Sequence, residues 1–217
     1  MKKILGIILI GIAVILVLRI TGDREEVEPL PRNELQNEAL YEGELDGVED
    51  ARYLADTDNS LLTWKGKTVV KSHTGTLLLE SGELQTINGN LTGSFTIDMN
   101  SLATPDGEGV TNDLKSENFF DVDIYPTAEF EIANYSQGEL QGDLTIKGIT
   151  QPVSLPVSLS LGENTMRITG DVLVDRTLWG IEYRSDSVFS DLGDKAIDDN
   201  LEINIDILLK ANNGTGE

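Results

Sequence analysis

The sequence predicts an all-β fold, an antiparallel up-and-down β-barrel of about eight strands joined by short turns and one short helical connection. The main observation is that apolar and polar residues alternate with period two in segment after segment from Tyr53 onward, which is typical of sheets with one dry and one wet face. Glycines also stand inside several of these segments, where they suit the tight bends of a small barrel. The alternation fits a β-sandwich equally well, so these two observations leave both architectures open.

The first half of the domain contains three predicted strands. Residues 61–70 form the first strand or the start of a hairpin, residues 73–79 form the second, and residues 91–99 form the third. A glycine turn is expected at Gly82, between the second and third strands. The residues that share one face of the second and third strands are His73, Gly75, Leu77 and Leu79, and then Leu91, Gly93, Phe95, Ile97 and Met99.

The second half begins after a loop rich in glycine, proline and aspartate at residues 101–109. Residues 113–120 are expected to form one helical turn that directs Phe119 and Phe120 inward. Pro156 cannot donate a ladder hydrogen bond, so its strand should have a free edge or a bulge there. The residues that share a face in the five following strands are Ala128, Phe130 and Ile132; Leu140, Gly142, Leu144 and Ile146; Val153, Leu155, Val157, Leu159 and Leu161; Met166, Ile168, Gly170, Val172 and Val174; and Leu201, Ile203, Ile205, Ile207 and Leu209.

Residues 1–20 are expected to form an apolar helix that serves as a signal anchor or a signal peptide. The uncharged run from Ile4 to Leu18 would span ~22 Å as a helix, against ~30 Å for a hydrocarbon core, which fits either role. An Ala-x-Ala cleavage site is missing, which favours the anchor, and Lys2 and Lys3 favour a cytoplasmic N-terminus. The expected location is the bacterial cell envelope, with the domain outside the cytoplasm and anchored to the inner membrane, or periplasmic or secreted after cleavage.

The rest of the chain divides by composition into three parts. Residues 21–50 are strongly acidic with few large apolar side chains, so they are expected to form a flexible linker. Residues 51–211 carry the alternating pattern and form the predicted barrel, and residues 212–217 are expected to be a disordered tail.

The charge and the cysteine count of the 217-residue chain exclude several classes of function. A formal net charge of −22 argues against nucleic acid, which proteins bind through clustered Lys and Arg, and against docking onto an anionic lipid surface. The absence of cysteine removes disulfides, thiolate nucleophiles, cysteine zinc sites and a lipoprotein cysteine. Acidity of this degree is otherwise typical of a soluble exterior.

Several of the predicted strands carry ordered motifs. The two longest motifs are Leu-Lys-Ser-Glu-Asn-Phe-Phe-Asp-Val-Asp-Ile-Tyr-Pro-Thr-Ala-Glu-Phe, at residues 114–130, and Gly-Asp-Leu-Thr-Ile-Lys-Gly-Ile-Thr-Gln-Pro-Val, at residues 142–153. Shorter ones lie at residues 60–67, 73–76, 93–102 and 175–181. Through these motifs, the chain from about Tyr53 to Ala211 resembles the YceI-like family.

This resemblance implies a lipocalin-like barrel, and so it favours the barrel over the sandwich. The family is associated with binding polyisoprenoids and other amphipathic lipids, so the resemblance also implies a hydrophobic lipid ligand in the barrel interior. A histidine often precedes the Leu-Lys-Ser segment in the family, whereas this chain has Asp113 there. If this position contacts the ligand, the preference for a head group in this chain should differ from that of relatives with histidine.

Two kinds of residue are candidates for ligand contact. Large aromatic side chains, Trp64 among them, either pack in the core or line a cavity, and a cation such as Arg184 either binds a phosphate or pairs with a surface acid. His73 is either a hydrogen-bonded residue of the barrel wall or rim, or a contact for the polar head. The predicted ligand-binding residues are His73, Phe95, Lys115, Phe119, Phe120, Phe130, Leu144, Arg176 and Trp179.

No catalytic activity, metal or cofactor is expected. His73 is the only histidine, no Gly-x-Ser-x-Gly elbow accompanies it, and zinc would need ligands that the chain lacks. Carboxylate pairs such as Asp121 with Asp123 arise by chance in so acidic a chain. Two alternatives to lipid binding stay open, a packed barrel that acts as a structural or partner-binding module of the envelope, and a hydrolase. The oligomeric state is open too, with a homodimer among the alternatives.

Overall fold

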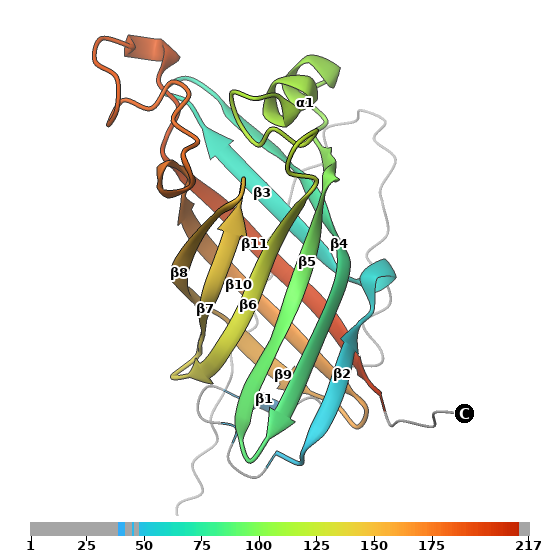
Figure 1. Ribbon diagram of the computed structural model, residues 1–217. Helices are drawn as coiled ribbons and strands as arrows, with labels where there is room; N and C mark the ends of the chain where they lie inside the picture. The colour runs from blue at the N-terminus through green and yellow to red at the C-terminus, as the bar shows by residue number, and fades with distance from the viewer. Residues whose placement is uncertain (1–38, 42–44, 46–47, 213–217) are drawn as a thin grey trace, which may run out of the picture. The chain divides into compact units, whose positions relative to one another are not determined.

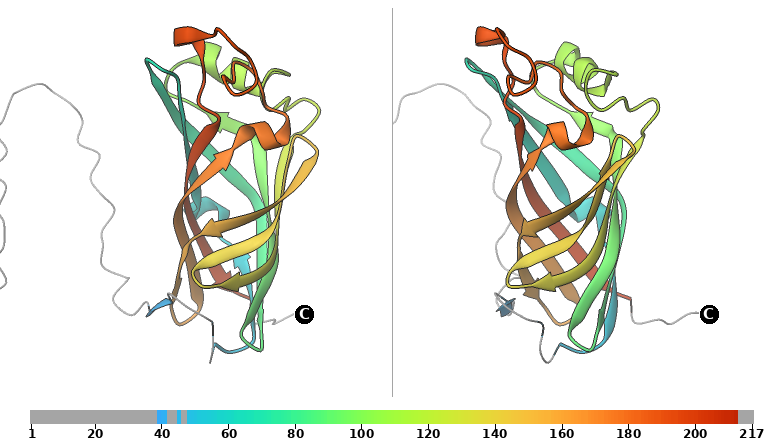
Figure 2. Two further views of the ribbon diagram at one scale, coloured as in Figure 1. Left: turned by 90° about the vertical axis from the view of Figure 1, so that its left-hand side faces the viewer. Right: turned by 60° about the vertical axis from the view of Figure 1, so that its left-hand side comes forward.

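The strands of the chain form an antiparallel β-barrel (Figures 1 and 2). The computed structural model describes residues 39–41, 45 and 48–212, all within one unit that spans residues 37–217. The described elements are β1 (Ala39–Tyr41), β2 (Ala51–Ala55), η1 (Thr57–Asn59), β3 (Leu61–Lys67), β4 (Ser72–Ile87), β5 (Asn90–Ala103), α1 (Glu108–Lys115), β6 (Thr127–Ser136), β7 (Glu139–Ile146), β8 (Ile149–Pro156), β9 (Ser158–Leu161), β10 (Thr165–Asp175), η2 (Arg176–Trp179), η3 (Gly193–Lys195) and β11 (Asn200–Ala211).

Two broken strands close the barrel. β2 and β3 are separated by the short 3₁₀ helix η1, and because both pair with β4 and with β11, they share one position in the sheet. β8 pairs with β7 while β9 pairs with β10, so the chain changes neighbours between β8 and β9. The barrel therefore has eight strand positions, β2/β3, β4, β5, β6, β7, β8/β9, β10 and β11, as the sequence predicted, and β1 pairs with β9.

The prediction that Pro156 marks an irregularity is confirmed. Pro156 is the last residue of β8, and the backbone N–H of Val157 donates to the carbonyl oxygen of Gly138 (2.9 Å) before β9 begins. At Gly170 of β10, an added Cβ would lie 2.7 Å from the carbonyl oxygen of Pro156. A glycine at this point therefore lets β10 approach the bend closely.

The expected turn at Gly82 is wrong, because β4 continues through this residue to Ile87. The chain turns instead at Asn88 and Gly89, both of which have positive φ. Gly82 lies opposite Phe95, whose ring comes within 2.3 Å of the place where a Cβ would stand. The glycine thus makes room for a large inward side chain on the neighbouring strand.

A register shift in the β4–β5 ladder between Leu79 and Ser81 changes which residues of β4 face inward. Leu79 is buried before the shift, and Leu84 and Thr86 are buried after it, so the inward positions change from odd to even. Period-two alternation in the sequence carries no sign of this extra residue.

The helical connection also starts earlier than predicted. The helix α1 covers Glu108–Lys115, whereas the prediction placed a helical turn at residues 113–120. It ends where the extended Ser116 donates its backbone N–H to the carbonyl oxygen of Asp113 (3.1 Å). The predicted inward direction of Phe119 and Phe120 agrees with their burial, which is nearly complete for the first and partial for the second.

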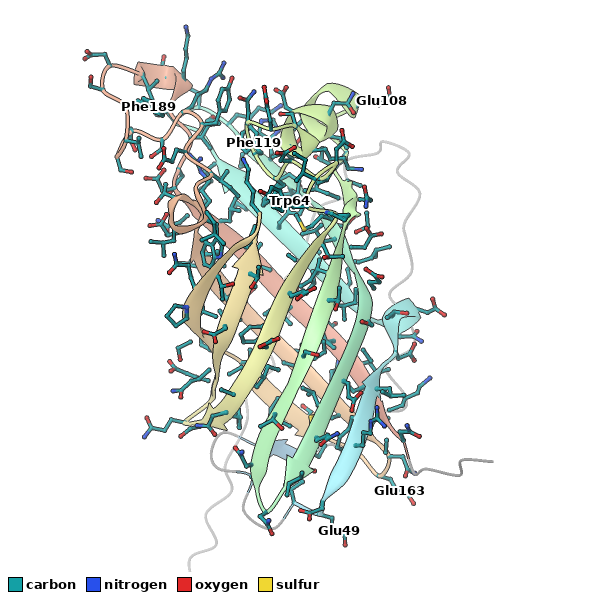
Figure 3. All side chains as sticks on the ribbon, in the orientation of Figure 1. Glu49, Trp64, Glu108, Phe119, Glu163 and Phe189 are labelled. Atoms are coloured by element: carbon teal, nitrogen blue, oxygen red, sulfur yellow. The ribbon has the colours of Figure 1, made fainter. Side chains whose placement is uncertain are left out.

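The core fills one end of the barrel, where β4 turns into β5. Glu49 and Glu163 mark this end in Figure 3, and Trp64, Glu108 and Phe119 mark the opposite one, which we call the open end. The side chains that are completely buried at the filled end include Leu84, Leu91, Leu159, Met166 and Leu209. The packed core thus closes this end against solvent.

Parts of the predicted domain plan lie outside the described residues, namely the apolar helix at residues 1–20, most of the linker and residues 213–217. Among the residues that are described, no helix has the length and apolar character to cross a membrane. Within the segment expected to be a linker, β1 pairs with β9, and Leu45 is buried in the core at 1% exposure. The domain boundary at residue 51 stays a prediction.

The close approach of strands at Gly142 yields a stability prediction. An added Cβ would lie 2.0 Å from the carbonyl oxygen of Glu131 on β6, so Gly142→Ala must push two paired strands apart. We expect a loss of about 3 kcal/mol in the free energy of unfolding, measured by urea denaturation. Gly109→Ala in α1 is the matched control, because nothing lies within 4 Å of its Cβ position, and it should be neutral or stabilising. Equal stability of the two variants would contradict the close approach.

Candidate ligand-binding cavities

Two adjacent cavities occupy the open half of the barrel. The deeper one, which we call the interior cavity, has a volume of about 140 Å³ and only apolar lining residues. An apolar cavity of ~150 Å³ is large enough to take up a molecule the size of benzene. The interior cavity is lined by Leu62, Leu77, Leu79, Phe95, Ile97, Met99, Phe120, Ala128, Phe130, Leu144, Ile146, Leu155, Val172, Val174, Leu201, Ile203, Ile205 and Ile207.

The second cavity, the mouth cavity, lies between the barrel wall, α1 and the segment after η2. Its volume is about 190 Å³, and its lining mixes apolar with charged residues. It shares Leu77, Phe120, Leu201 and Ile203 with the interior cavity, so the two lie next to each other. The other lining residues are Trp64, Gly66, Lys67, Thr68, His73, Leu102, Val110, Asp113, Leu114, Phe119, Arg176, Ile181, Tyr183, Arg184 and Ile197.

The predicted faces of the strands account for most of the interior lining. Phe95, Ile97 and Met99 lie on one face of β5, and Leu144 and Ile146 lie on one face of β7, as expected from alternation. Ile97 and Ile146 are only partly buried although they point inward, because they border empty space rather than packed atoms. The partial exposure of inward side chains therefore marks the hollow part of the barrel.

Most of the predicted ligand-binding residues come together in these cavities. Phe95, Phe130 and Leu144 line the interior cavity, and Phe120 lines both. His73, Phe119 and Arg176 line the mouth cavity. Ligand contact by these side chains stays a prediction, since the geometry establishes only their position.

Lys115 and Trp179 line neither of the two cavities. Lys115 Nζ donates to the carbonyl oxygen of Asn100 (2.6 Å), which joins the end of α1 to β5. Trp179 is 1% exposed and its Nε1–H donates to the carbonyl oxygen of Leu144 (3.0 Å). Both contacts stabilise the wall and its connections, so the structure favours structural roles for these two residues.

Aromatic rings from two different segments meet at the mouth. Phe119, which follows α1, packs edge-to-face on Tyr183, which follows η2, with their ring centroids 5.3 Å apart. The guanidinium of Arg184 lies 5.0 Å from the ring centre of Tyr183. Tyr183 is not among the residues predicted from the sequence, because residues 182–199 show no alternation from which a side-chain direction could be predicted.

Arg176 organises the segment that follows η2. Although it lines the mouth cavity, it is 2% exposed, and its Nη1 donates to the carbonyl oxygen of Ile181 (2.5 Å). Its Nε and Nη2 donate to the carbonyl oxygens of Asp198 (3.1 Å) and Ile197 (3.0 Å), and Nη2 also donates to Asp199 Oδ1 (3.3 Å). These bonds use most of the five N–H donors of the guanidinium. Arg176 therefore holds both ends of the loop that carries Tyr183.

The charges around Arg176 compensate one another. Burial lowers the pKa of Arg176 from its ordinary value, while the neighbouring carboxylates, with Asp199 first among them, act in the opposite direction. Burial likewise tends to raise the pKa of Asp199, but hydrogen bonds from Ser187 and Ser185 and the charge of Arg176 outweigh it, so this pKa lies below its usual range. Asp199 is therefore an ionised partner for the buried cation at neutral pH.

His73 and Asp106 form a polar contact at the rim. Nδ1 of His73 lies 2.8 Å from Asp106 Oδ2, and this hydrogen bond lowers the pKa of Asp106, with a smaller contribution from the charge of Lys71. Of the two readings of His73 from the sequence, the hydrogen-bonded wall or rim residue agrees with this contact. Asp113, where the family often has histidine, is exposed and lines the mouth cavity.

Large exposed apolar side chains gather on the loops at the open end. They come from the β3–β4 turn, the loop before β6, the β7–β8 turn and the segment that starts at η2 (Figures 1 and 3). The residues concerned are Val69, Val70, Ile124, Ile149, Leu178, Val188 and Phe189. The open end therefore combines an accessible cavity with an apolar rim.

Comparison with known proteins identifies the domain. A family model described as the YceI-like domain matches residues 53–209. Among curated proteins, UPF0312 protein SAB2563 of Staphylococcus aureus is 28% identical over 109 residues, which cover 45% of this chain and 64% of that protein. UPF0312 protein SA2479 of the same species is 32% identical over 83 residues, which cover 35% of this chain and 48% of that protein. The matches thus span about half to two thirds of these relatives.

Solved structures with the same fold cover most of the barrel. The crystal structure of BcnA from Burkholderia cenocepacia has a TM-score of 0.59 at 18% identity, with 71% of this chain and 98% of that chain covered. A polyisoprenoid binding domain from Saccharophagus degradans, implicated in plant cell wall breakdown, also has a TM-score of 0.59, at 15% identity, with 75% and 99% covered. At these identities the likeness shows a shared fold.

The contacts of Arg176 predict that its loss is chiefly a loss of stability. Arg176→Ala leaves three backbone carbonyls and a carboxylate without their donor, so we expect the free energy of unfolding to fall by about 3 kcal/mol, as measured in urea. Arg184→Ala, which removes an exposed cation from the same cavity lining, should cost within about 1 kcal/mol. A stable Arg176→Ala protein would argue that the guanidinium serves a ligand instead.

Proposed function

Because the chain belongs to the YceI-like family, we propose that it binds one hydrophobic, lipid-like chain in the two cavities of its barrel. A structural relative named as a polyisoprenoid binding domain supports a polyisoprenoid or a similar amphipathic lipid as the ligand. The proposal covers a binding protein and includes no catalytic step.

The observation that carries this proposal is the interior cavity, whose lining residues are all apolar. Such a cavity offers no hydrogen bond to water and is filled most favourably by hydrocarbon. Each buried methylene contributes about 0.8 kcal/mol, so a chain of ~10 methylenes contributes roughly 8 kcal/mol before the costs of ordering the chain are subtracted. The apolar rim of the open end supports uptake through the mouth cavity.

The uneven filling of the interior weighs against the packed structural barrel. A structural barrel would be expected to fill its interior with side chains, whereas this one is filled at one end and hollow at the other. Within the described part of the chain, no group of three or more His, Asp or Glu side chains could hold a metal ion.

The main test combines extraction with a filling substitution. Organic extraction of the purified protein followed by mass spectrometry should yield a stoichiometric lipid. Leu144→Trp should fill part of the interior cavity, so that lipid uptake falls sharply while the ligand-free protein still folds. Asp143→Trp on the same strand is the control, because Asp143 is exposed on the outer face and its substitution should leave uptake unchanged.

Three outcomes would contradict the proposal. The first is an absence of lipid from the parent protein together with no uptake of added lipid. The second is an unfolded Leu144→Trp variant, which would indicate that the residue packs against solid core, where overpacking costs ~1–3 kcal/mol. The third is that Asp143→Trp alone blocks uptake, which would place the ligand outside the barrel.

We further propose that the domain lies outside the cytoplasm and is tethered to the inner membrane by residues 1–20. Protease added to spheroplasts should then digest the domain, and the protein should remain in the membrane fraction. Full protection from the protease would overturn the export proposal. A mature N-terminus near Thr21 would instead favour cleavage of a signal peptide.

A further inference from the structure

The interior cavity ends at one level of the barrel. On β5, which leads from the filled end to the open end (Figure 1), Phe95 lines the cavity, whereas Leu91, nearer the filled end, is completely buried and lies outside the lining. Four other strands show the same change from a lining residue to a buried inward side chain. These pairs are Phe130 and Ile132 on β6, Leu144 and Leu140 on β7, Val172 and Ile168 on β10, and Ile207 and Leu209 on β11. The cavity therefore has a floor, formed by the last lining residue of each strand.

Within this floor, the ring of Phe95 fills a place where the neighbouring strand has no side chain. Phe95 pairs with Gly82 of β4, and a Cβ on that glycine would lie 2.3 Å from Cδ1 and 2.6 Å from Cε1 of the ring. The next atom near the same position is Cβ of Ala55 on β2, at 3.0 Å. The ring therefore leans from β5 over β4 toward β2.

Beside the ring, toward the filled end, lies a second glycine. Gly93 is the next inward position on β5, and a Cβ there would lie 2.8 Å from Cδ2 of Leu84, which is completely buried. Without its ring, residue 95 would stand between two glycines, and Leu84 would be the first side chain of the packed core beyond them. Phe95 thus separates the hollow from the core on this side of the barrel, and it is itself only 4% exposed.

The polar lining residues give a bound lipid one direction. Charged residues such as Lys67, Asp113 and Arg184 line the mouth cavity, whereas the interior cavity has only apolar lining residues. A polar group buried without a hydrogen bond is costly, so the polar group of an amphipathic lipid belongs in the mouth cavity. The apolar end of its chain then points at the floor.

We propose that Phe95 determines the length of chain that the barrel accepts, because the apolar end of the bound lipid stops against its ring. This inference rests on the proposed function, since it concerns the ligand that occupies the same cavities. Each methylene buried above the floor adds affinity, whereas a methylene for which the cavity has no room stays in water and adds none. The affinity for lipids with one head group should therefore rise with chain length up to a limit, and Phe95 sets that limit.

The test measures binding of a series of linear primary alcohols, namely hexanol, octanol, decanol, dodecanol, tetradecanol and hexadecanol, by isothermal titration calorimetry. In the parent protein, affinity should rise about fourfold for each added methylene up to one length and then level off. Phe95→Ala should move this limit to a longer alcohol. For the first alcohol beyond the limit of the parent, the variant should bind about tenfold more tightly than the parent does.

Two further variants support the test. Phe95→Leu keeps an apolar side chain of intermediate size, so it should move the limit in the same direction by a smaller amount, and it decides the question if Phe95→Ala does not fold. Phe120→Ala is the matched control, because it removes the same ring from the boundary that the interior cavity shares with the mouth cavity. It should weaken binding of all the alcohols by a similar factor and leave the limit unchanged.

The outcomes separate this inference from the proposed function. If no alcohol binds the parent protein, the proposed function fails and this inference fails with it. If the alcohols bind but the limit is the same in the parent and the Phe95 variants, or if Phe120→Ala moves it equally, the inference is overturned while lipid binding stands. The same holds if the affinity of the parent rises without a limit through hexadecanol, or if Phe95→Leu does not fold, which would make Phe95 a part of the packed core.

Discussion

Closure of the sheet is the constraint on which the rest of this structure depends. An open sheet edge leaves backbone donors and acceptors without partners, and two interrupted strands limit such edges in this barrel: β2/β3 pairs on both sides, whereas β8 pairs with β7 and β9 pairs with β10. The bend after Pro156 transfers the chain from β7 to β10, and Gly170 leaves space for it. In the barrel, the inward faces of all strands share one interior. The same arrangement therefore buries the apolar residues and forms the cavity.

That interior is filled unevenly, and the difference gives the protein its binding capacity. At the filled end, residues such as Leu84, Met166 and Leu209 leave no exposed surface, and their packing supplies stability whether or not a ligand is present. At the open end, side chains such as Ile97 and Ile203 point inward but border a cavity. An apolar ligand would replace missing packing contacts there, so binding and stabilisation of the hollow half should be coupled.

Polar chemistry at the open end is mostly structural. Arg176 would be an obvious candidate for an anionic head group from its position, but its donors hold the loop between Ile181 and Asp199. Most other polar groups of the mouth cavity are paired or exposed, and the interior cavity has only apolar lining residues. The buried Trp64 N–H is the exception among the described side chains, because it is buried without a hydrogen-bond partner.

The sequence by itself determined the fold class and most of the interior lining, because period-two alternation assigns Phe95, Phe130 and Leu144 to one face without reference to other strands. It could not determine features that depend on a neighbouring strand or loop. Three such features are the bulge after Leu79, the space that Gly82 leaves for Phe95, and the hydrogen bonds that occupy the donors of Arg176. All three arise from contacts between residues distant in the chain. The hollow and the unsatisfied Trp64 N–H also depend on contacts between distant residues. Alternation predicts which side chains point inward, but only the barrel as a whole determines whether side chains from opposite strands contact one another or leave a cavity.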